Sequence, residues 1–433
     1  MTYTEKNFKF MQLFFLLIGF GLSLFYAQHQ ILTGDQTQML YKGYLGAYKD
    51  IWTSFGNAAS VVGNVPGSMI SFAVGVPIVL YDSPWSPMLL VIFLHLFSYL
   101  LLDNVIKGIF KSDIRLVFLI IYWLNPWLLF ENILYNPSYL FFFSALHFWT
   151  AFKMREKSSF IYATLHVLAI GLAMQFHYSW LILGIISLYL IFRKMVQVNW
   201  YGVIFGIMLV GASLVPYAIE FMNNEAIRHN QDPNASKRYI GWGGVHVYPV
   251  LKSFIYWLRY GSFIFPNKLI ASAHFDWLGL SSGLQIAVAY LYKAIVFSVG
   301  AVSVYISYKA NRYFYEEVKT KIFTRNVLIN SKEEWLLLYV FGALFGVFIS
   351  SILSPIIFSY WHLIIVFPFA IMPFLVYFKQ YSRQYLQKFI FFVSLYFVLI
   401  NLLGAVDSRK YALDKNYAKD AQAYVTKTIK NPE

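Results

Sequence analysis

The stretch FMQLFFLLIGFGLSLFYA, residues 10–27, contains no charged side chain and follows Lys6 and Lys9. A helix needs about 20 apolar residues to cross the hydrocarbon core of a bilayer, so this stretch matches one membrane span. No A-x-A cleavage site follows it, and we interpret it as a retained anchor rather than a secretory signal. It predicts a helical membrane protein, because a helix satisfies all of its own backbone polar groups in lipid.

The composition of the whole chain agrees with this prediction. Of its 433 residues, 59% are hydrophobic and only 12% are charged, whereas soluble domains are about 25% charged. A soluble enzyme is therefore excluded. The net charge of +14 is explained by basic cytoplasmic loops and an anionic lipid surface, without nucleic acid. The absence of cysteine excludes disulfides and thiolate metal sites.

Apolar blocks recur along the chain and predict about eleven spans in all. After residues 10–27 they lie at 87–106, 116–130, 138–152, 160–174, 180–192, 201–219, 284–308, 335–353, 363–378 and 389–403. With the N-terminus in the cytoplasm, basic residues gather in the inner connections, and the short outer connections 131–136, 175–178 and 354–362 hold none. This separation predicts the orientation of the protein.

Three longer segments are then expected outside. Residues 28–86 form a first periplasmic loop, 220–283 a large periplasmic loop, and 406–433 a periplasmic tail, all attached to a transmembrane domain over residues 1–405. Within the first loop, the apolar stretch 68–81 is short for a span, and we expect a helix at the outer interface there. If it spanned, the basic loops would lie outside, against the charge distribution.

Asp35 is the sharpest candidate for a catalytic group. It follows Gly34 shortly after the first span, where a turn can point its carboxylate over the outer mouth of the bundle. The alternative is that Asp35 only caps a helix that begins near Gln36, with Gln38 completing a capping box. Lys42, in the same segment, is a candidate substrate-binding residue.

Polar residues also gather at three outer turns that connect or end the predicted spans. Turn chemistry or an aromatic belt at the interface would explain each turn alone, but all of them fall on the side of the membrane that holds Asp35. We therefore expect these turns to supply substrate-binding residues, namely Glu131, Asn136, His177, Tyr178, Tyr360 and His362.

Basic residues that could bind a phosphate are fewer. Lys293 lies inside an apolar block, where a charged residue either snorkels or has a function. Arg259 and Lys252 are seven residues apart and share one helical face to within about 20°. That face could hold a lipid phosphate or lie on anionic headgroups. Three histidines inside spans are interpreted as helix-packing partners, namely His95, His147 and His166.

No phosphate-cradling glycine-rich loop, H-E-x-x-H or G-x-S-x-G motif is present. No predicted cytoplasmic segment is large enough for a nucleotide-sugar fold. Any activated group is therefore expected to come from a donor dissolved in the membrane.

The order of the motifs resembles that of the GT-C integral-membrane glycosyltransferases. Gly34-Asp35 opens the first outer loop, Pro66-Gly67 leads into an apolar helix, and Asp82-Ser83-Pro84 ends it. The motifs that follow are similar to later outer turns of that family, namely Asn125-Pro126-Trp127, Tyr135-Asn136-Pro137-Ser138, Gln175 to Ser179, and Tyr360-Trp361-His362. The closest branch looks like the protein O-mannosyltransferases and the lipid A aminoarabinose transferase.

This resemblance implies a GT-C-like bundle with juxtamembrane helices in the first outer loop, an outward-facing site and a polyprenyl-phosphate-linked sugar as donor. It implies transfer with inversion to a glycan, lipid or protein acceptor in a bacterial inner membrane. By position, Asp35 would be the base, while His362, His177, Arg259 and Lys293 are candidates for the donor phosphate.

The sequence also departs from the family pattern. The usual Asp-Glu pair is Asp35-Gln36 here, Val65 replaces an Arg or His, and Tyr360-Trp361-His362 replaces an Arg-Tyr motif. A carboxylate beside an amide is a poor cage for Mg²⁺ or Mn²⁺, so we expect no metal cofactor.

A different class of function stays open. In a flippase or transporter for lipid-linked sugars or polysaccharides, Lys293 and the histidines would line a path. Such a protein should place polar residues near the membrane midplane in broken helices. The polar clusters of this chain instead gather toward one surface.

Overall fold

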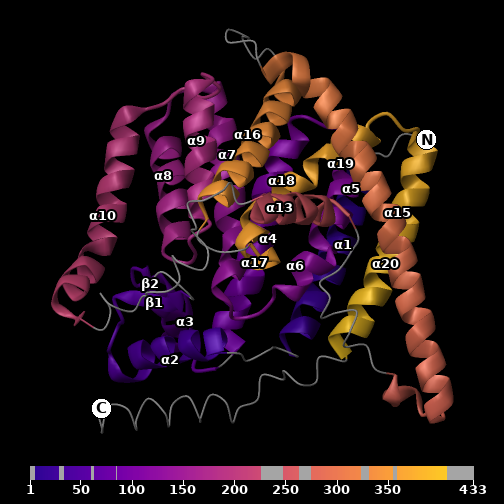
Figure 1. The fold of residues 1–433 in the computed structure, drawn as a ribbon, viewed down its shortest axis with the longest axis horizontal. Helices are drawn as coiled ribbons and strands as arrows, with labels where there is room; N and C mark the ends of the chain where they lie inside the picture. The colour runs from indigo at the N-terminus through magenta and orange to yellow at the C-terminus, as the bar shows by residue number, and fades with distance from the viewer. Residues whose placement is uncertain are drawn as a thin grey trace.

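The computed structural model describes residues 5–28, 34–59, 63–83, 85–225, 247–262, 275–322, 331–354 and 358–406. Apart from one two-stranded hairpin, the regular structure is helical (Figure 1). The prediction of an all-α polytopic fold is confirmed. The first half consists of α1 (Glu5–Ala27), α2 (Gly34–Lys49), β1 (Phe55–Ala59), β2 (Gly63–Pro66), α3 (Met69–Leu80), α4 (Trp85–Lys107), α5 (Ser112–Trp123), α6 (Pro126–Phe130), η1 (Asn136–Tyr139), α7 (Leu140–Glu156), α8 (Phe160–Met174), α9 (Trp180–Phe192) and α10 (Trp200–Asn223).

The second half of the chain contains the longest helix and a broken one. Its elements are α13 (Val247–Tyr260), η2 (Asp276–Leu278), α15 (Ser282–Ile322), α16 (Lys332–Leu353), α17 (Tyr360–Leu363), η3 (Ile364–Val366), α18 (Phe367–Ala370), α19 (Met372–Phe378) and α20 (Arg383–Val406). In the part of the chain that the structure describes, eight helical segments are long and apolar enough to cross a membrane. The apolar helices α8 and α9 are shorter, with 15 and 13 residues.

Two predicted spans differ in form from the expectation. The block at 284–308 is part of α15, which has 41 residues and at 1.5 Å per residue is roughly 60 Å long. The block at 363–378 is divided among α17, η3, α18 and α19. Pro368 and Pro373 lie in this segment, and each removes a backbone donor that a continuous helix would need.

The first loop folds into a compact layer of α2, the hairpin and α3. The predicted interfacial helix at 68–81 is present as α3, whereas the antiparallel pairing of β1 with β2 was not expected. Helix α2 packs closely on α3, because a Cβ placed on Gly43 would lie 2.3 Å from Val74 Cγ1. We call α2, β1, β2 and α3 the first-loop layer.

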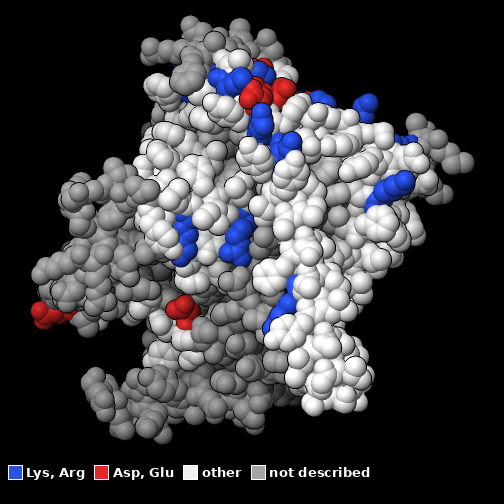
Figure 2. Space-filling model, turned by 45° about the vertical axis from the view of Figure 1, so that its right-hand side comes forward, with Lys and Arg blue, Asp and Glu red and all other residues white. Residues whose placement is uncertain are grey.

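The two ends of the bundle differ in charge. The first-loop layer lies at the lower end in Figure 1, and we call this the hairpin end. The opposite end carries ion pairs between helix ends, including Lys332 with Glu156 at 3.4 Å and Lys321 with Glu334 at 3.9 Å. Figure 2 shows charged side chains gathered at that upper end and only scattered ones on the flank below it. We call it the basic end.

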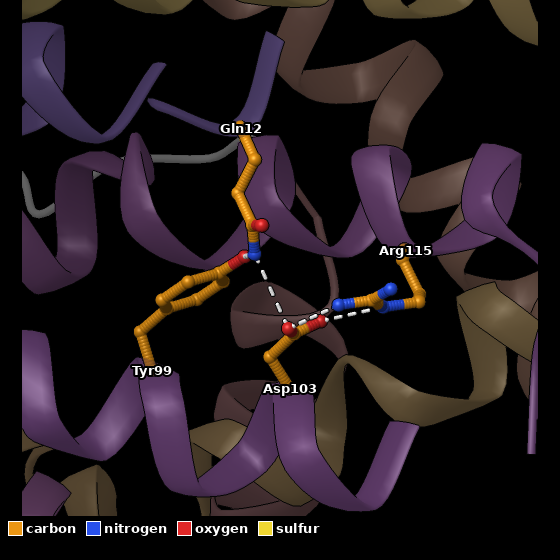
Figure 3. A network of polar contacts seen from close by, with 4 residues as sticks. All are labelled: Gln12, Tyr99, Asp103 and Arg115. Carbon is orange, nitrogen blue, oxygen red and sulfur yellow. Dashed lines mark hydrogen bonds and ion pairs between the residues drawn. The ribbon is translucent and has the colours of Figure 1, made fainter. Parts of the chain in front are cut away.

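A buried polar network joins three helices toward the basic end (Figure 3). Arg115 of α5 makes two contacts with Asp103 of α4, at 2.9 and 2.5 Å, and Gln12 of α1 donates to Asp103 at 3.2 Å. The Gln12 amide also donates to the Tyr99 hydroxyl at 2.9 Å.

Parts of the two other predicted outer segments lie outside the described residues, namely 226–246 and 263–274 of the large loop and the tail from 407. Between those parts, α13 lies crosswise to the spans (Figure 1). Trp257 Nε1 donates to Asn311 of α15 at 2.9 Å, and Ser307 of α15 donates to the Leu258 carbonyl at 3.0 Å. These contacts fix α13 against the bundle and thereby place Arg259.

Candidate active site

Glu131 lies in the turn after α6, and local sequence explains its position. Asn125 caps α6 by accepting from the Trp127 amide at 3.0 Å, and Pro126 begins the helix. The short helix ends at Glu131, whose side chain is fully buried. The Ser138 hydroxyl donates to Glu131 Oε2 at 3.0 Å. A carboxylate is thus held at the hairpin end, inside the bundle.

Asp35 and Glu131 lie near the same phenol. Burial raises the pKa of Tyr135, and the charges of Glu131 and then Asp35 raise this pKa further. The Asn57 amide donates to the Asp35 carbonyl at 2.9 Å, which attaches the first turn of α2 to the hairpin. The first-loop carboxylate and the carboxylate of the next predicted outer turn therefore both act on the Tyr135 phenol.

The capping alternative for Asp35 and Gln38 does not hold. Helix α2 begins at Gly34, which places Asp35 inside its first turn. Gln38 Oε1 accepts from the Ala58 amide of β1 at 3.0 Å instead of completing a capping box. Asp35 is partly buried, and this burial raises the pKa of its carboxyl group. A raised pKa makes a carboxylate a stronger base.

Lys42 lies in the first-loop layer, two turns further along α2. Its side chain is buried, and its ammonium lies 5.4 Å from the centre of the Phe55 ring. Burial lowers the pKa of Lys42 to about 8.

Asn136 and Tyr178 both bind backbone carbonyls. Asn136 Nδ2 donates to the Phe176 carbonyl at 2.9 Å, which joins the turn of Glu131 to the turn between α8 and α9. The Tyr178 hydroxyl donates to the Asn64 carbonyl of β2 at 3.0 Å. The turns predicted to lie on one side are therefore in direct contact.

The two candidate histidines lie beside each other, with ring centroids 5.4 Å apart. His362 Nδ1 accepts from the Ser359 amide at 2.9 Å and caps α17, so part of its role is structural. Burial and the neighbouring His362 lower the pKa of His177. At neutral pH His177 can therefore offer a phosphate an N–H group and no positive charge.

Arg259 of α13 packs against aromatic rings, including that of Trp127 in the short helix that precedes Glu131. Its guanidinium lies 5.4 Å from the Trp127 ring and 5.3 Å from the Tyr256 ring. The Tyr260 hydroxyl donates to the Tyr360 carbonyl, and burial followed by the charge of Glu131 raises the Tyr260 pKa. Trp127 and Tyr135 lie within motifs quoted from the sequence, and Tyr260 follows Arg259, but none of the three was predicted as a site residue.

Lys293 does not join this group. Its nearest reported ring is Tyr290 of the same helix, at 6.0 Å. Helix α15 contacts α13 at Ser307, and Lys293 is 14 residues before it, which is roughly 21 Å of helix axis. Lys293 and Arg259 therefore start from distant points on the bundle, and Lys293 stays a prediction as a donor-phosphate residue.

His147 and His166 are helix-packing partners, as predicted. His147 bonds to Tyr339 of α16 at 2.6 Å and to Ser187 of α9 at 2.8 Å. His166 of α8 bonds to the same Ser187 hydroxyl at 2.9 Å. The imidazoles thus link α7, α8, α9 and α16.

We asked whether the side chains at the hairpin end could hold a metal ion. No three His, Asp or Glu side chains in the described ranges are placed to do so. Asp35 adjoins Gln36 in the sequence, and an amide is a neutral ligand. We therefore derive no step through a metal.

The fold is similar to that in the crystal structure of ArnT from Cupriavidus metallidurans bound to undecaprenyl phosphate. The TM-score is 0.52 at 10% sequence identity, and the match covers 96% of this chain and 77% of that one. No protein-family model and no curated protein matches the sequence. At such low identity the likeness concerns the fold, and it confirms the expected GT-C-like architecture.

Proposed function

We propose that this chain is an inverting glycosyltransferase that moves a sugar from a polyprenyl-phosphate donor to an acceptor hydroxyl. The observation that carries the proposal is the direct bonding of the first-loop layer, which bears Asp35, to the turns that bear the other candidates, through Tyr178 to Asn64 and Asn136 to Phe176. The similar protein, ArnT, was solved with undecaprenyl phosphate, which supports a donor of this class.

In the proposed reaction, Asp35 acts as the general base. Its carboxylate takes the proton of the acceptor hydroxyl while the acceptor oxygen forms a bond to the anomeric carbon. The bond from that carbon to the phosphate oxygen breaks, and polyprenyl phosphate leaves with the electron pair. Attack opposite the leaving group inverts the anomeric centre. The raised pKa of Asp35 favours this role.

The other candidate residues are proposed to stabilise the departing phosphate, orient the substrates and shape the site. Arg259 is the cation proposed to stabilise the departing phosphate, because it lies over Trp127, four residues before the buried Glu131. Glu131 and Tyr360 orient the sugar or the acceptor, and His177 and His362 supply polar contacts. Asn136 and Tyr178 shape the site, since each already binds a backbone carbonyl. Lys42, buried within the first-loop layer, is proposed to act in donor binding.

The proposed setting is a bacterial inner membrane with the site on the periplasmic side. The separation of basic residues between the ends of the bundle supports this orientation. The isoprenoid chain of the donor would lie in the bilayer, and the acceptor would be a glycan, a lipid or a protein. We propose no metal or other cofactor for the transfer.

The test is transfer of radiolabel in detergent from undecaprenyl-phosphate sugars, charged with labelled pentoses or hexoses, to an extract of the cell envelope. Asp35→Asn should lower the rate by at least about 100-fold, the usual contribution of a general base. Asp50→Asn is the matched control, because Asp50 belongs to the same loop and its backbone φ of 54° suits Asn equally well. Full activity of Asp35→Asn would exclude Asp35 as the base.

The same assay separates the enzyme from the flippase or transporter. Detergent removes the compartments, so a transporter moves no label between molecules. The broken segment from Leu363 to Phe374 contains only apolar residues and proline, which does not favour a polar path at mid-depth. A label that stays on its donor while vesicles containing the protein move the donor across the bilayer would establish transport instead.

A further inference from the structure

His95 of α4 contacts the turn that carries Glu131 at two points. Its Nδ1 lies 3.1 Å from Asn132 Oδ1, and its Nε2 lies 2.9 Å from the Ser138 carbonyl oxygen. The His95 and Asn132 side chains are buried. The ring therefore bridges two points of this turn that are six residues apart in sequence.

The chemistry of the partners determines how the ring is held. A carbonyl oxygen can only accept, so His95 Nε2 carries a hydrogen and donates it to Ser138. A neutral imidazole has one N–H, so Nδ1 has no hydrogen to give Asn132 Oδ1, and the bond to Ser138 is the one that orients the ring. The edge of Phe141 packs on the ring, with centroids 4.9 Å apart. The imidazole is fixed by contacts on several sides.

The bond to Ser138 leads to Glu131. The residue whose carbonyl accepts from His95 is the one whose hydroxyl donates to Glu131 Oε2, at 3.0 Å. If Ser138 moves, the donor to the carboxylate moves with it. The position of the Glu131 oxygens is thus tied to the position of the His95 ring.

We propose that His95 is a positioning residue that aims the Glu131 carboxylate at the substrate, acting through Ser138. The proposal rests on the function proposed above, in which Glu131 orients the sugar or the acceptor. A misplacement of about 1 Å at a positioned group can cost about 100-fold in rate. Packing between helices alone would stabilise the bundle without this coupling.

The first experiment needs no activity. Hydrogen–deuterium exchange of the purified protein reports on the turn amides, several of which bond within residues 128–138. His95→Leu should speed exchange in residues 131–139. His166→Leu is the control, because His166 is also a buried intramembrane histidine but bonds to Thr150 and Ser187. It should leave residues 131–139 unchanged. Unaltered exchange there in His95→Leu would overturn the proposal.

The second experiment is a double-mutant cycle on the transfer rate. If His95 acts through Glu131, His95→Leu should lower transfer by about 10- to 100-fold in the wild type and have little further effect in Glu131→Gln. His166→Leu should have the same effect in both backgrounds. Equal losses from His95→Leu in both backgrounds would show a structural role only, and would overturn the proposal.

A conservative variant covers the case in which His95→Leu does not fold. His95→Gln keeps one N–H donor that can reach the Ser138 carbonyl, so it should retain normal exchange at 131–139 and recover most of the transfer rate. Fast exchange with undiminished transfer in His95→Gln would contradict the coupling. If Glu131→Gln alone transfers at the wild-type rate, the proposed role of Glu131 fails, and the exchange result still decides whether His95 holds the turn.

Discussion

The Tyr178 hydroxyl donates a hydrogen bond of 3.0 Å to the backbone carbonyl of Asn64, 114 positions earlier in the chain. This bond joins the turn between α8 and α9 to strand β2 of the first-loop layer. His177, a candidate site residue, precedes Tyr178 in the same turn. The bond therefore holds the layer that carries Asp35 against the bundle that carries the other candidates.

Tyr178→Phe should loosen this attachment without unfolding the bundle. Loss of one such hydrogen bond costs about 1 kcal/mol, so we expect faster hydrogen exchange in residues 55–66 and a transfer rate lowered by several-fold. Tyr201→Phe removes a hydroxyl from a tyrosine that is 81% exposed and should change neither measurement. Exchange in the hairpin that matches the wild type would show that other contacts hold the layer.

The rate of transfer should fall on acidification, because a general base must be deprotonated. Burial raises the pKa of Asp35 above its ordinary value of 3.8, so the acid limb of the pH profile should have its midpoint above that value. The residual rate of Asp35→Asn should lack this limb. A midpoint below 3.8, or the same limb in the Asn variant, would assign the titration to another group.

Lys42 should make the protein more stable as the pH rises from about 8 to 10.5. Burial lowers the pKa of Lys42 from 10.5 to about 8 in the folded protein, so the unfolded state binds more protons within this window and stability increases with pH. Lys42→Met should abolish this increase and raise the unfolding temperature at pH 7. Lys49→Met, at the exposed end of α2, should do neither.

Lys42→Met also tests whether Lys42 takes part in binding the donor. A buried ammonium that destabilises the fold is expected to serve binding or catalysis. Lys42→Met should therefore weaken binding of undecaprenyl phosphate while it stabilises the protein, and a titration with that lipid measures the loss. Unchanged affinity would leave Lys42 outside the donor site.

Gly67→Ala should destabilise the contact between the hairpin and the bundle. Gly67 has φ of 86°, and an added Cβ would lie 2.1 Å from Gln175 Oε1. The Gln175 amide is bonded to Ser213 at 2.8 Å, so it cannot move away without cost. Gln175→Ala should restore part of the lost unfolding temperature in the double variant, while the backbone strain of about 1 kcal/mol remains. No recovery would place the whole cost in the backbone.

Much of the fold was predictable from hydropathy and from the polar turn residues that separate the apolar blocks. The bounds of α8 and α9 agree with the predicted blocks 160–174 and 180–192, because polar turns flank both. The continuation of α15 past Tyr308 was missed, since its last third is polar and hydropathy does not report helix there. The β1–β2 hairpin was missed because FGNAA and GNVP lack the alternation of a strand signal and hold one β-branched residue between them, Val65.

The site was predictable in its charged members and less so in its aromatic ones. Asp35 and Glu131 were selected because acids are rare in this chain, with 20 in 433 residues. Trp127, Tyr135 and Tyr260 carried no comparable signal, because aromatic residues make up 20% of the sequence. Lys293 was selected for its unusual depth, and only the helix contacts of α13 show that it lies apart.

Asp103 and Arg115 should stabilise the protein as a pair and destabilise it singly (Figure 3). Their side chains are only 10% and 12% exposed, and removing one partner of a buried pair leaves a charge without compensation, at a cost of about 3–5 kcal/mol. We expect Asp103→Leu and Arg115→Met each to lower the unfolding temperature in detergent strongly. The double variant should lose much less than the sum of the two, because no buried charge remains. Gln12→Leu, which removes only the neutral donor to Asp103, should have a smaller effect than either. Additive losses would show that solvent or another group already compensates each charge at the basic end.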